Sequence, residues 1–193
     1  MADAEHRLLQ MAKAGDTDCF ERLIEGSRQR AYNIALRYLR EEQDAMDALQ
    51  ESLIKVYRNL DRFQENSRFD TWVYRIVINT CNDMIRKSKR RSTTEDSLRS
   101  FDDVEKRLEP ADPAPGPEQQ VLNQEQRKQI LDVLEQLPKE YKEILILREI
   151  QGFSYEEIME LLDCSLGTVK SRISRARMGF RDHWNQYQKL ASK

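Results

Sequence analysis

Four of the five prolines in this 193-residue chain lie within one eight-residue run, PADPAPGP, at positions 110–117. Proline lacks a backbone N–H and ends helices, so such a run separates the parts of a chain that fold on either side of it. The stretch before it, from Ser92, is polar, and between Ser92 and Gln120 eight acids face three bases, a net charge of −5. We therefore expect a flexible acidic linker at 92–117 between two small domains at 1–91 and 118–193.

Both domains are predicted to be all-α. The chain has only six glycines, it contains no Asn-Gly or Asp-Gly turn pair, and sustained alternation of apolar and polar residues is absent. Apolar residues recur instead at three- and four-residue steps, the period of helices that bury one face. Charged residues make up 34% of the chain, above the usual share of about a quarter, which favours long solvated helices.

Composition excludes several classes of protein. The chain has no apolar run of membrane-spanning length, and its N-terminus, MADAEHRLLQ, lacks the apolar core of a signal peptide. Its three widely spaced cysteines indicate a reduced, cytoplasmic compartment, and with two histidines no metal site fits a known spacing. No glycine-rich phosphate loop, serine elbow or paired His/Cys arrangement occurs. The sequence predicts a protein that is not an enzyme, needs no metal or cofactor and does not insert into a membrane.

The segment DAMDALQESLIKVYRNL, residues 44–60, predicts a helix with one acidic flank. Its apolar stripe consists of Ala45, Leu49, Leu53, Val56 and Leu60. The polar positions that lie away from this stripe are Asp44, Asp47, Gln50, Glu51 and Lys55. The helix can therefore present acids to a partner while it packs through its opposite side.

A further helix is predicted from Asp70, whose carboxylate suits the orphan amides of a first turn, to about Arg91. Its apolar face holds Tyr74, Val77, Ile78, Cys81 and Ile85. A second row at the same spacing is polar and consists of Arg75, Asn79, Asn82 and Arg86. The helix ends in IRKSKRR, which holds more bases than complementing a helix dipole requires.

Aromatic residues precede and open this helix, where Phe63, Phe69 and Trp72 interleave with Arg62 and Arg68. Aromatic stacking surfaces beside cations are what single-stranded nucleic acid needs from a protein. Each aromatic side chain taken alone is better explained by packing in the core. Of the three, Phe69 and Trp72 are the better candidates for contact with bases.

The C-terminal part contains a predicted helix-turn-helix. Ser154 and Glu157 form a capping box that opens YEEIMELLD, CSLG turns the chain, and TVKSRISRARMGF resumes a helix capped by Ser165. In this last helix an apolar stripe, which includes Val169, Ile173 and Ala176, faces inward. Lys170, Ser171, Ser174 and Arg175 face outward. Such a face suits the major groove of DNA, where cations neutralise phosphates and bond guanine edges; a merely solvated face is the alternative.

Taken together, three segments resemble the bacterial sigma factors of the extracytoplasmic-function (ECF) type, in the sigma-70 family. They are DAMDALQESLIKVYRNLDRF, SRFDTWVYRIVINTCNDMIRKSKRR and LPKEYKEILILREIQGFSYEEIMELLDCSLGTVKSRISRARMGFRDHW. The resemblance covers about residues 5–91 and 118–187, and the order of the segments is more specific than any one of them. It implies sigma region 2 at 1–91, sigma region 4 at 118–193 and a role in promoter-specific initiation.

The resemblance also implies a role for individual residues. The positions that it assigns to docking on core RNA polymerase are Asp44, Asp47, Gln50 and Glu51. Those assigned to the melted minus-ten element are Phe63, Arg68, Phe69, Trp72, Arg75, Asn79, Asn82 and Arg86. Those assigned to the minus-thirty-five element are Arg148, Thr168, Lys170, Ser171, Arg172, Ser174, Arg175 and Arg177. Among the last set, Arg148, Thr168, Arg172 and Arg177 are expected to contact phosphates.

The partners that the resemblance implies are core RNA polymerase, through the clamp helices of its beta-prime subunit and through its beta subunit, and promoter DNA. The free protein is expected to be a monomer held inactive by an anti-sigma factor at the membrane. The acidic linker would thread the RNA channel of the polymerase, although composition alone explains it equally as a solvated tether. Lys170 stands where related proteins often have arginine, and Ser174 is small where some have a bulky residue, so the target sequence is left open.

Two other functions compete with this interpretation. The C-terminal half alone would also suit a helix-turn-helix regulator with an N-terminal dimerisation or sensor domain, which binds a palindromic duplex unaided. An RNA-binding adaptor that uses the basic cluster at 86–91 is a third possibility, but it leaves the helix-turn-helix without a role.

Overall fold

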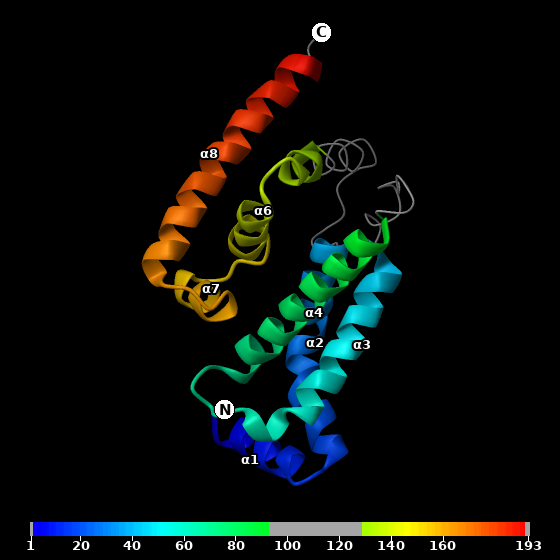
Figure 1. Cartoon of the computed structure of the whole chain (residues 1–193). Coiled ribbons are helices and arrows are strands. Elements are labelled where there is room, and N and C mark those ends of the chain that lie inside the picture. The colour runs from blue at the N-terminus through cyan, green and yellow to red at the C-terminus, as the bar shows by residue number, and fades with distance from the viewer. Residues whose placement is uncertain (1, 93–128, 192–193) are drawn as a thin grey trace, which may run out of the picture. The chain divides into compact units, whose positions relative to one another are not determined.

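The computed structural model describes residues 2–92 and 129–191, so the predicted linker beyond Ser92 lies outside the described residues. The chain divides into two compact units, Met1–Val104 and Glu105–Lys193. Their described parts are called here the N-terminal unit and the C-terminal unit. All regular structure in these parts is helical, as predicted (Figure 1).

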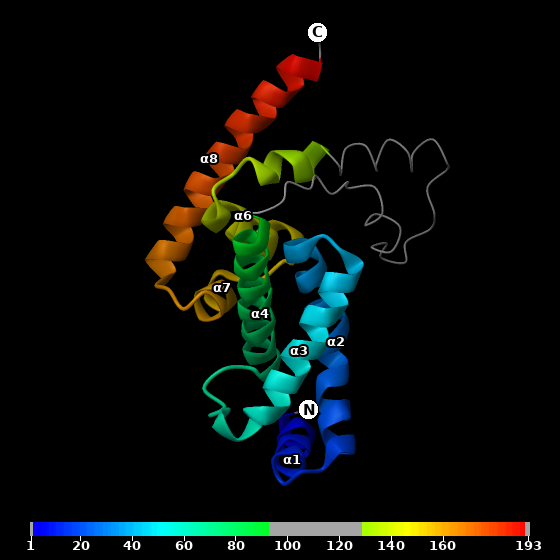
Figure 2. The same cartoon turned by 45° about the vertical axis from the view of Figure 1, so that its right-hand side comes forward.

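The N-terminal unit is a bundle of four α-helices. These are α1 (Ala2–Lys13), α2 (Thr17–Leu39), α3 (Glu42–Arg58) and α4 (Phe69–Ser92), with a 3₁₀ turn, η1 (Leu60–Arg62), between the last two. Helix α2 contacts α1, α3 and α4. Both views show α2, α3 and α4 side by side and α1 at the end of the bundle where η1 lies (Figures 1 and 2).

Local signals set the ends of these helices. Gly15 follows α1 with a φ of 98°, a conformation that glycine adopts without the clash of a Cβ atom. Asp16 caps α2, because its side chain accepts a hydrogen bond of 2.9 Å from the Cys19 N–H. The prediction for α4 was wrong by one residue: the Trp72 N–H bonds to the Arg68 carbonyl, so Asp70 lies within the first turn, where a carboxylate still favours the dipole.

The core of the N-terminal unit combines small and branched side chains. Ala31, Ala35, Ala45 and Ala48 are fully buried on α2 and α3. Small side chains at facing positions let two helix backbones approach closely, and larger residues then fill the remaining space. The larger buried residues are Ile24, Ile34, Val56, Val73, Val77 and Ile78.

The C-terminal unit begins with a short helical segment at 129–135. It continues with α6 (Lys139–Leu145), a π-helical segment, η3 (Ile146–Ile150), α7 (Tyr155–Leu161) and α8 (Leu166–Ala191). Its core holds Ile144, Leu147, Phe153, Ile158, Val169 and Ile173. Gly179 permits close packing of α8, because a Cβ atom there would lie 3.2 Å from the Leu137 side chain.

Candidate nucleic-acid interface

The polar row on α4 is formed as predicted. Arg75, Asn79 and Arg86 are exposed and Asn82 is half-buried. The four positions recur at three- and four-residue steps and therefore share one side of the helix. Arg86 pairs with Asp83, one turn away, so its charge is partly balanced before any ligand binds.

The aromatic residues near the start of α4 form one cluster. The Phe63 ring centroid lies 5.5 Å from that of Phe69 and 5.1 Å from that of Trp72. Phe63 and Phe69 are only 5% and 4% exposed, whereas Trp72 is half-buried. The expectation that Phe69 is displayed for stacking is therefore wrong for this conformation; with Phe63 it supports Trp72 from inside. Lys13 ties the cluster to α1 by donating a 2.9 Å hydrogen bond to the Phe63 carbonyl.

A polar hollow of about 570 Å³ lies beside the polar row, between α3 and α4. It is lined by Lys55, Asn59, Arg62, Trp72, Arg75, Ile76, Asn79, Thr80 and Asp83. Lys55, Asn59 and Thr80 were not among the predicted DNA contacts. Nothing in the sequence places α3 beside α4, so spacing along one helix could not reveal a site that two helices share.

The acidic face of α3, defined as Asp44, Asp47, Gln50 and Glu51, is also displayed. Asp47, Gln50 and Glu51 are exposed and Asp44 is half-buried. Ile54, 52% exposed, follows Gln50 and Glu51 at helical spacing on the same side. Ile54 was not among the docking residues predicted from the sequence. An acidic face with an exposed isoleucine is suited to a protein partner, which can cover the apolar surface, more than to DNA.

The helix-turn-helix of the C-terminal unit is held by its caps. The Ser154 hydroxyl accepts a hydrogen bond from the Glu157 N–H, and the Glu157 carboxylate accepts one from the Ser154 N–H, as the capping box predicts. Ser165 accepts a bond of 3.1 Å from the Thr168 N–H at the start of α8. In the turn between the helices, Asp163 adopts a φ of 48°. These bonds fix the direction in which α8 leaves the turn.

The recognition face of α8, defined as Lys170, Ser171, Ser174 and Arg175, points away from the core. Lys170, Ser174 and Arg175 are exposed, while Val169, Ile173 and Ala176 on the opposite side are buried. Ser171 is half-buried, and its hydroxyl donates a 3.0 Å bond to the Thr168 carbonyl. The outward residues thus include two cations that are available to base edges or phosphates.

The arginines that were predicted to contact phosphates are held by hydrogen bonds and ion pairs within the C-terminal unit. Arg148 donates a 2.7 Å bond to the Phe153 carbonyl and lies 4.8 Å from the Tyr155 ring centroid. Arg172 pairs with Glu140 at 3.5 Å, and Arg177 donates two bonds to Glu149. The bonds to Glu149 raise the pKa of the Arg177 guanidinium. These arginines brace the unit around α8.

An apolar groove of about 450 Å³ lies elsewhere on the C-terminal unit. Its walls include Ile130, Leu134, Leu145, Ile150, Phe180 and Trp184, and Glu149, Arg177 and Arg181 line its polar edge. Phe180, Trp184 and Tyr187 stack along α8 with centroids 6.0 and 6.5 Å apart. This groove could not be predicted from the sequence, because it depends on how α8 packs against residues far away in the chain.

Three further features of the described residues are their buried thiols, their potential metal ligands and the apolarity of their helices. Burial raises the pKa of the Cys81 thiol to about 12 and also raises that of Cys19, so both thiols are protonated at neutral pH. Within 2–92 and 129–191 there is no group of three or more His, Cys, Asp or Glu side chains that could hold a metal ion. No helix in these ranges has the length and apolarity needed to cross a membrane.

Each of the two units matches a model of a known protein family. Residues 23–91 match the model for sigma-70 region 2, and residues 127–178 match the model for sigma-70 region 4. The ECF RNA polymerase sigma-E factor of Haemophilus influenzae is 36% identical over 176 residues, which cover 90% of this chain and 91% of the relative. The RNA polymerase sigma-H factor of Pseudomonas aeruginosa is 33% identical over 180 residues, or 91% of each chain.

Solved structures share the fold. CnrH, solved in complex with the cytosolic domain of CnrY, matches with a TM-score of 0.68 at 21% identity and covers 95% of this chain and 98% of its own. The sigma factor RpoE, solved with the anti-sigma factor NepR from Bartonella quintana, matches with a TM-score of 0.65 at 24% identity and covers 86% and 96%. Both similarities concern the arrangement of helices.

Proposed function

The chain belongs to the sigma-70 family, in its extracytoplasmic-function group, and we propose that it binds core RNA polymerase and promoter DNA through the faces described above. As a sigma factor it directs promoter-specific transcription initiation. The observation that carries the proposal is the presence in one chain of the acidic face, the polar row and the helix-turn-helix, in that order. The chain acts as a specificity subunit, and the polymerase carries out the chemistry.

The acidic face of α3 docks on the clamp helices of the beta-prime subunit. Asp47 and Glu51 supply charge, and Ile54 supplies apolar contact area at the same surface. In the C-terminal unit, the apolar groove at Phe180 and Trp184 faces the beta subunit. These assignments leave the polar row and the recognition face for DNA.

The two DNA-binding faces take different forms of DNA. The polar row, with Trp72 at its end and Arg68 nearby, holds the non-template strand of the melted minus-ten element; Phe63 and Phe69 act as its buried support. The recognition face reads the duplex minus-thirty-five element in the major groove, with Thr168, Arg148, Arg172 and Arg177 at its phosphate edge.

Control by an anti-sigma factor follows from the same family. Of the two structurally similar proteins, CnrH was solved with the cytosolic domain of CnrY, and the sigma factor RpoE was solved with the anti-sigma factor NepR. We expect this protein to work in the cytoplasm, to be a monomer when free, and to be restrained by an anti-sigma factor at the membrane. The domain limits 1–91, 92–117 and 118–193 and the passage of the linker through the RNA channel belong to this proposal.

A charge reversal tests the docking face. Asp47→Lys should weaken binding to core polymerase by at least about tenfold, because two like charges then face each other across the interface. Glu25→Lys, an equal change at an exposed position of α2, is the matched control and should leave the affinity near that of the unchanged protein. Equal affinities for the two variants in a polymerase titration would refute the assigned face.

A further inference from the structure

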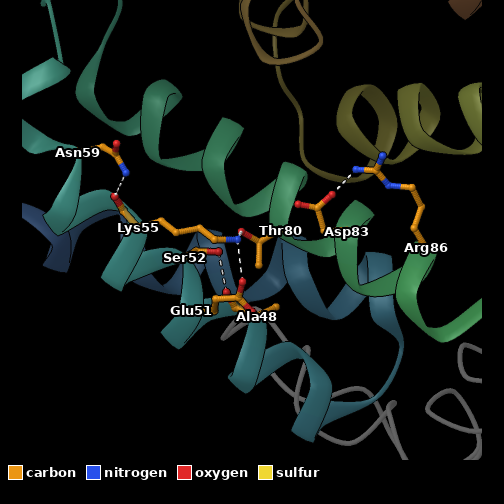
Figure 3. A network of polar contacts seen from close by, with 8 residues as sticks. All are labelled: Ala48, Glu51, Ser52, Lys55, Asn59, Thr80, Asp83 and Arg86. Atoms are coloured by element: carbon orange, nitrogen blue, oxygen red, sulfur yellow. Dashed lines mark hydrogen bonds and ion pairs between the residues drawn. The ribbon is translucent and has the colours of Figure 1, made fainter. Parts of the chain in front are cut away.

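Lys55 lies at the junction of two surfaces that the proposed function treats separately. Its Nζ atom is 2.7 Å from the Glu51 carboxylate on the acidic face and donates a 3.0 Å hydrogen bond to the Thr80 hydroxyl on α4 (Figure 3). Thr80 is buried, whereas the Lys55 and Glu51 side chains are 38% and 47% exposed. The bridge from α3 to α4 therefore remains within reach of a ligand.

The polar hollow that Lys55 helps to line suits a nucleotide in its charge and in its hydrogen-bonding groups. Lys55, Arg62 and Arg75 bring three cations to its lining, against one acid, Asp83, which is itself paired with Arg86. Asn59 and Asn79 add amide donors and acceptors, and the Asn59 amide donates to the Lys55 carbonyl, which fixes its position. Cations suit a phosphodiester, and amides suit the edge of a base.

The lysine ammonium group is occupied by Glu51 in this structure. A partner surface that binds the acidic face must present cations to it. Because Glu51 has a single carboxylate, a partner cation that pairs with it competes with Lys55 for the same negative charge. Docking at Glu51 thus weakens the hold on Lys55. The Thr80 hydroxyl is neutral and leaves the full positive charge of the ammonium available.

We propose that Lys55 couples polymerase docking to strand binding: Glu51 holds it in the free protein, and docking releases its ammonium group to a phosphate of single-stranded DNA in the polar hollow. This inference rests on the proposed function, because it takes the acidic face as the docking site. The free protein then binds single-stranded DNA weakly partly because Glu51 competes with phosphate for Lys55.

Neutralising Glu51 in the free protein should imitate docking. In fluorescence anisotropy at low salt, with the full chain and a labelled mixed-sequence DNA oligonucleotide, Glu51→Gln should bind the strand about two- to fivefold more tightly, the range expected from one exposed ion pair. Asp44→Asn removes one negative charge from the same helix, but Asp44 lies about three helical turns before Lys55, whereas Glu51 pairs with Lys55 directly, so it should produce a clearly smaller gain.

Lys55→Gln identifies the residue responsible. Glutamine keeps an N–H donor for Thr80, so the bridge between α3 and α4 and the fold are preserved, which circular dichroism can verify. The double variant Glu51→Gln, Lys55→Gln should lose the gain seen with Glu51→Gln alone. Equal gains for Glu51→Gln and Asp44→Asn, or a gain that persists without Lys55, would overturn the coupling.

A separate titration with core polymerase distinguishes this failure from failure of the proposed function. A chain that binds polymerase but shows no gain with Glu51→Gln refutes the coupling alone. A chain that does not bind polymerase refutes the proposed function and removes docking as the trigger.

Discussion

The N-terminal and C-terminal units present nucleic-acid-binding residues in different ways. On α8 the recognition face is exposed above a buried stripe, and arginines around it are held by carboxylates and carbonyls of the same unit. On α4 the polar row borders a hollow, and two of the three nearby aromatic rings are buried. A rigid face suits a duplex of constant shape, whereas a hollow suits a single strand whose bases are free to turn. The difference supports assigning duplex reading to one unit and strand capture to the other.

The largest expected effect concerns the buried aromatic rings of the N-terminal unit. The contrast between the two units fails if these rings do not belong to its core. Phe69→Ala should lower the free energy of unfolding of the N-terminal unit by about 3–5 kcal/mol, the usual cost of removing a buried phenylalanine. The Trp72 fluorescence of a chain that carries Trp184→Phe reports denaturant unfolding of this unit alone. Ile54→Ala, at an exposed position, is the control and should cost little. If Phe69→Ala were as stable as the control, the ring would not be part of the core.

A substitution on α8 tests whether the recognition face binds duplex DNA and not single-stranded DNA. Arg175→Ala should weaken binding of the holoenzyme to duplex promoter DNA by about 1–3 kcal/mol, the range for one base-reading cation. Binding of the free protein to a single strand should change little, because α4 carries that activity. Lys189→Ala, which removes an exposed cation farther along α8, is the matched control and should leave both affinities near those of the unchanged protein. Equal losses on both forms of DNA would contradict the division of roles.

The capping box tests whether the helix-turn-helix depends on local bonds. Ser154→Ala should lower the stability of the C-terminal unit by about 1 kcal/mol, because the Glu157 N–H loses its acceptor. Trp184 fluorescence in a chain with Trp72→Phe follows unfolding of this unit. Glu157→Gln should cost less, since a glutamine side chain can still accept from the Ser154 N–H. The reverse order of the two losses would refute this account of the cap.

The smallest effect at neutral pH concerns Cys81. Burial raises the pKa of its thiol from 9.0 to about 12, so the folded state favours the neutral form. Its contribution to stability is therefore complete below about pH 9 and is lost as the pH rises toward 12. Over that range, denaturation followed by Trp72 fluorescence should show a steeper loss for the parent chain than for Cys81→Ala. Parallel losses would show that the thiol ionises as easily in the folded state as in the unfolded chain.

Much of the fold follows from local sequence signals. The capping box at Ser154 and the cap at Ser165 depend on side chains within a few residues, and the structure confirms both of them. The division between buried and exposed sides of α4 and α8 also follows, because helical period fixes which residues share a side. The linker that was predicted to join the two units lies, beyond Ser92, outside the described ranges.

Contacts between helices could not be predicted in the same way. Phe69 and Trp72 have the same spacing whether they face solvent or each other, and only packing against Phe63 separates the buried ring from the half-buried one. The bridge from Lys55 to Thr80 joins residues 25 positions apart on two helices. The groove at Trp184 likewise depends on Ile130 and Leu145, which no period along α8 brings together.

The most direct test of the central claim is gel filtration of the full chain with sigma-free core RNA polymerase from its source organism, followed by transcription from sheared genomic DNA. We predict that the protein co-elutes with the polymerase and that discrete new transcripts appear, which would also identify its promoters. A protein that does not co-elute, and that instead shifts duplex DNA on its own as a dimer, would contradict the account and support a helix-turn-helix regulator.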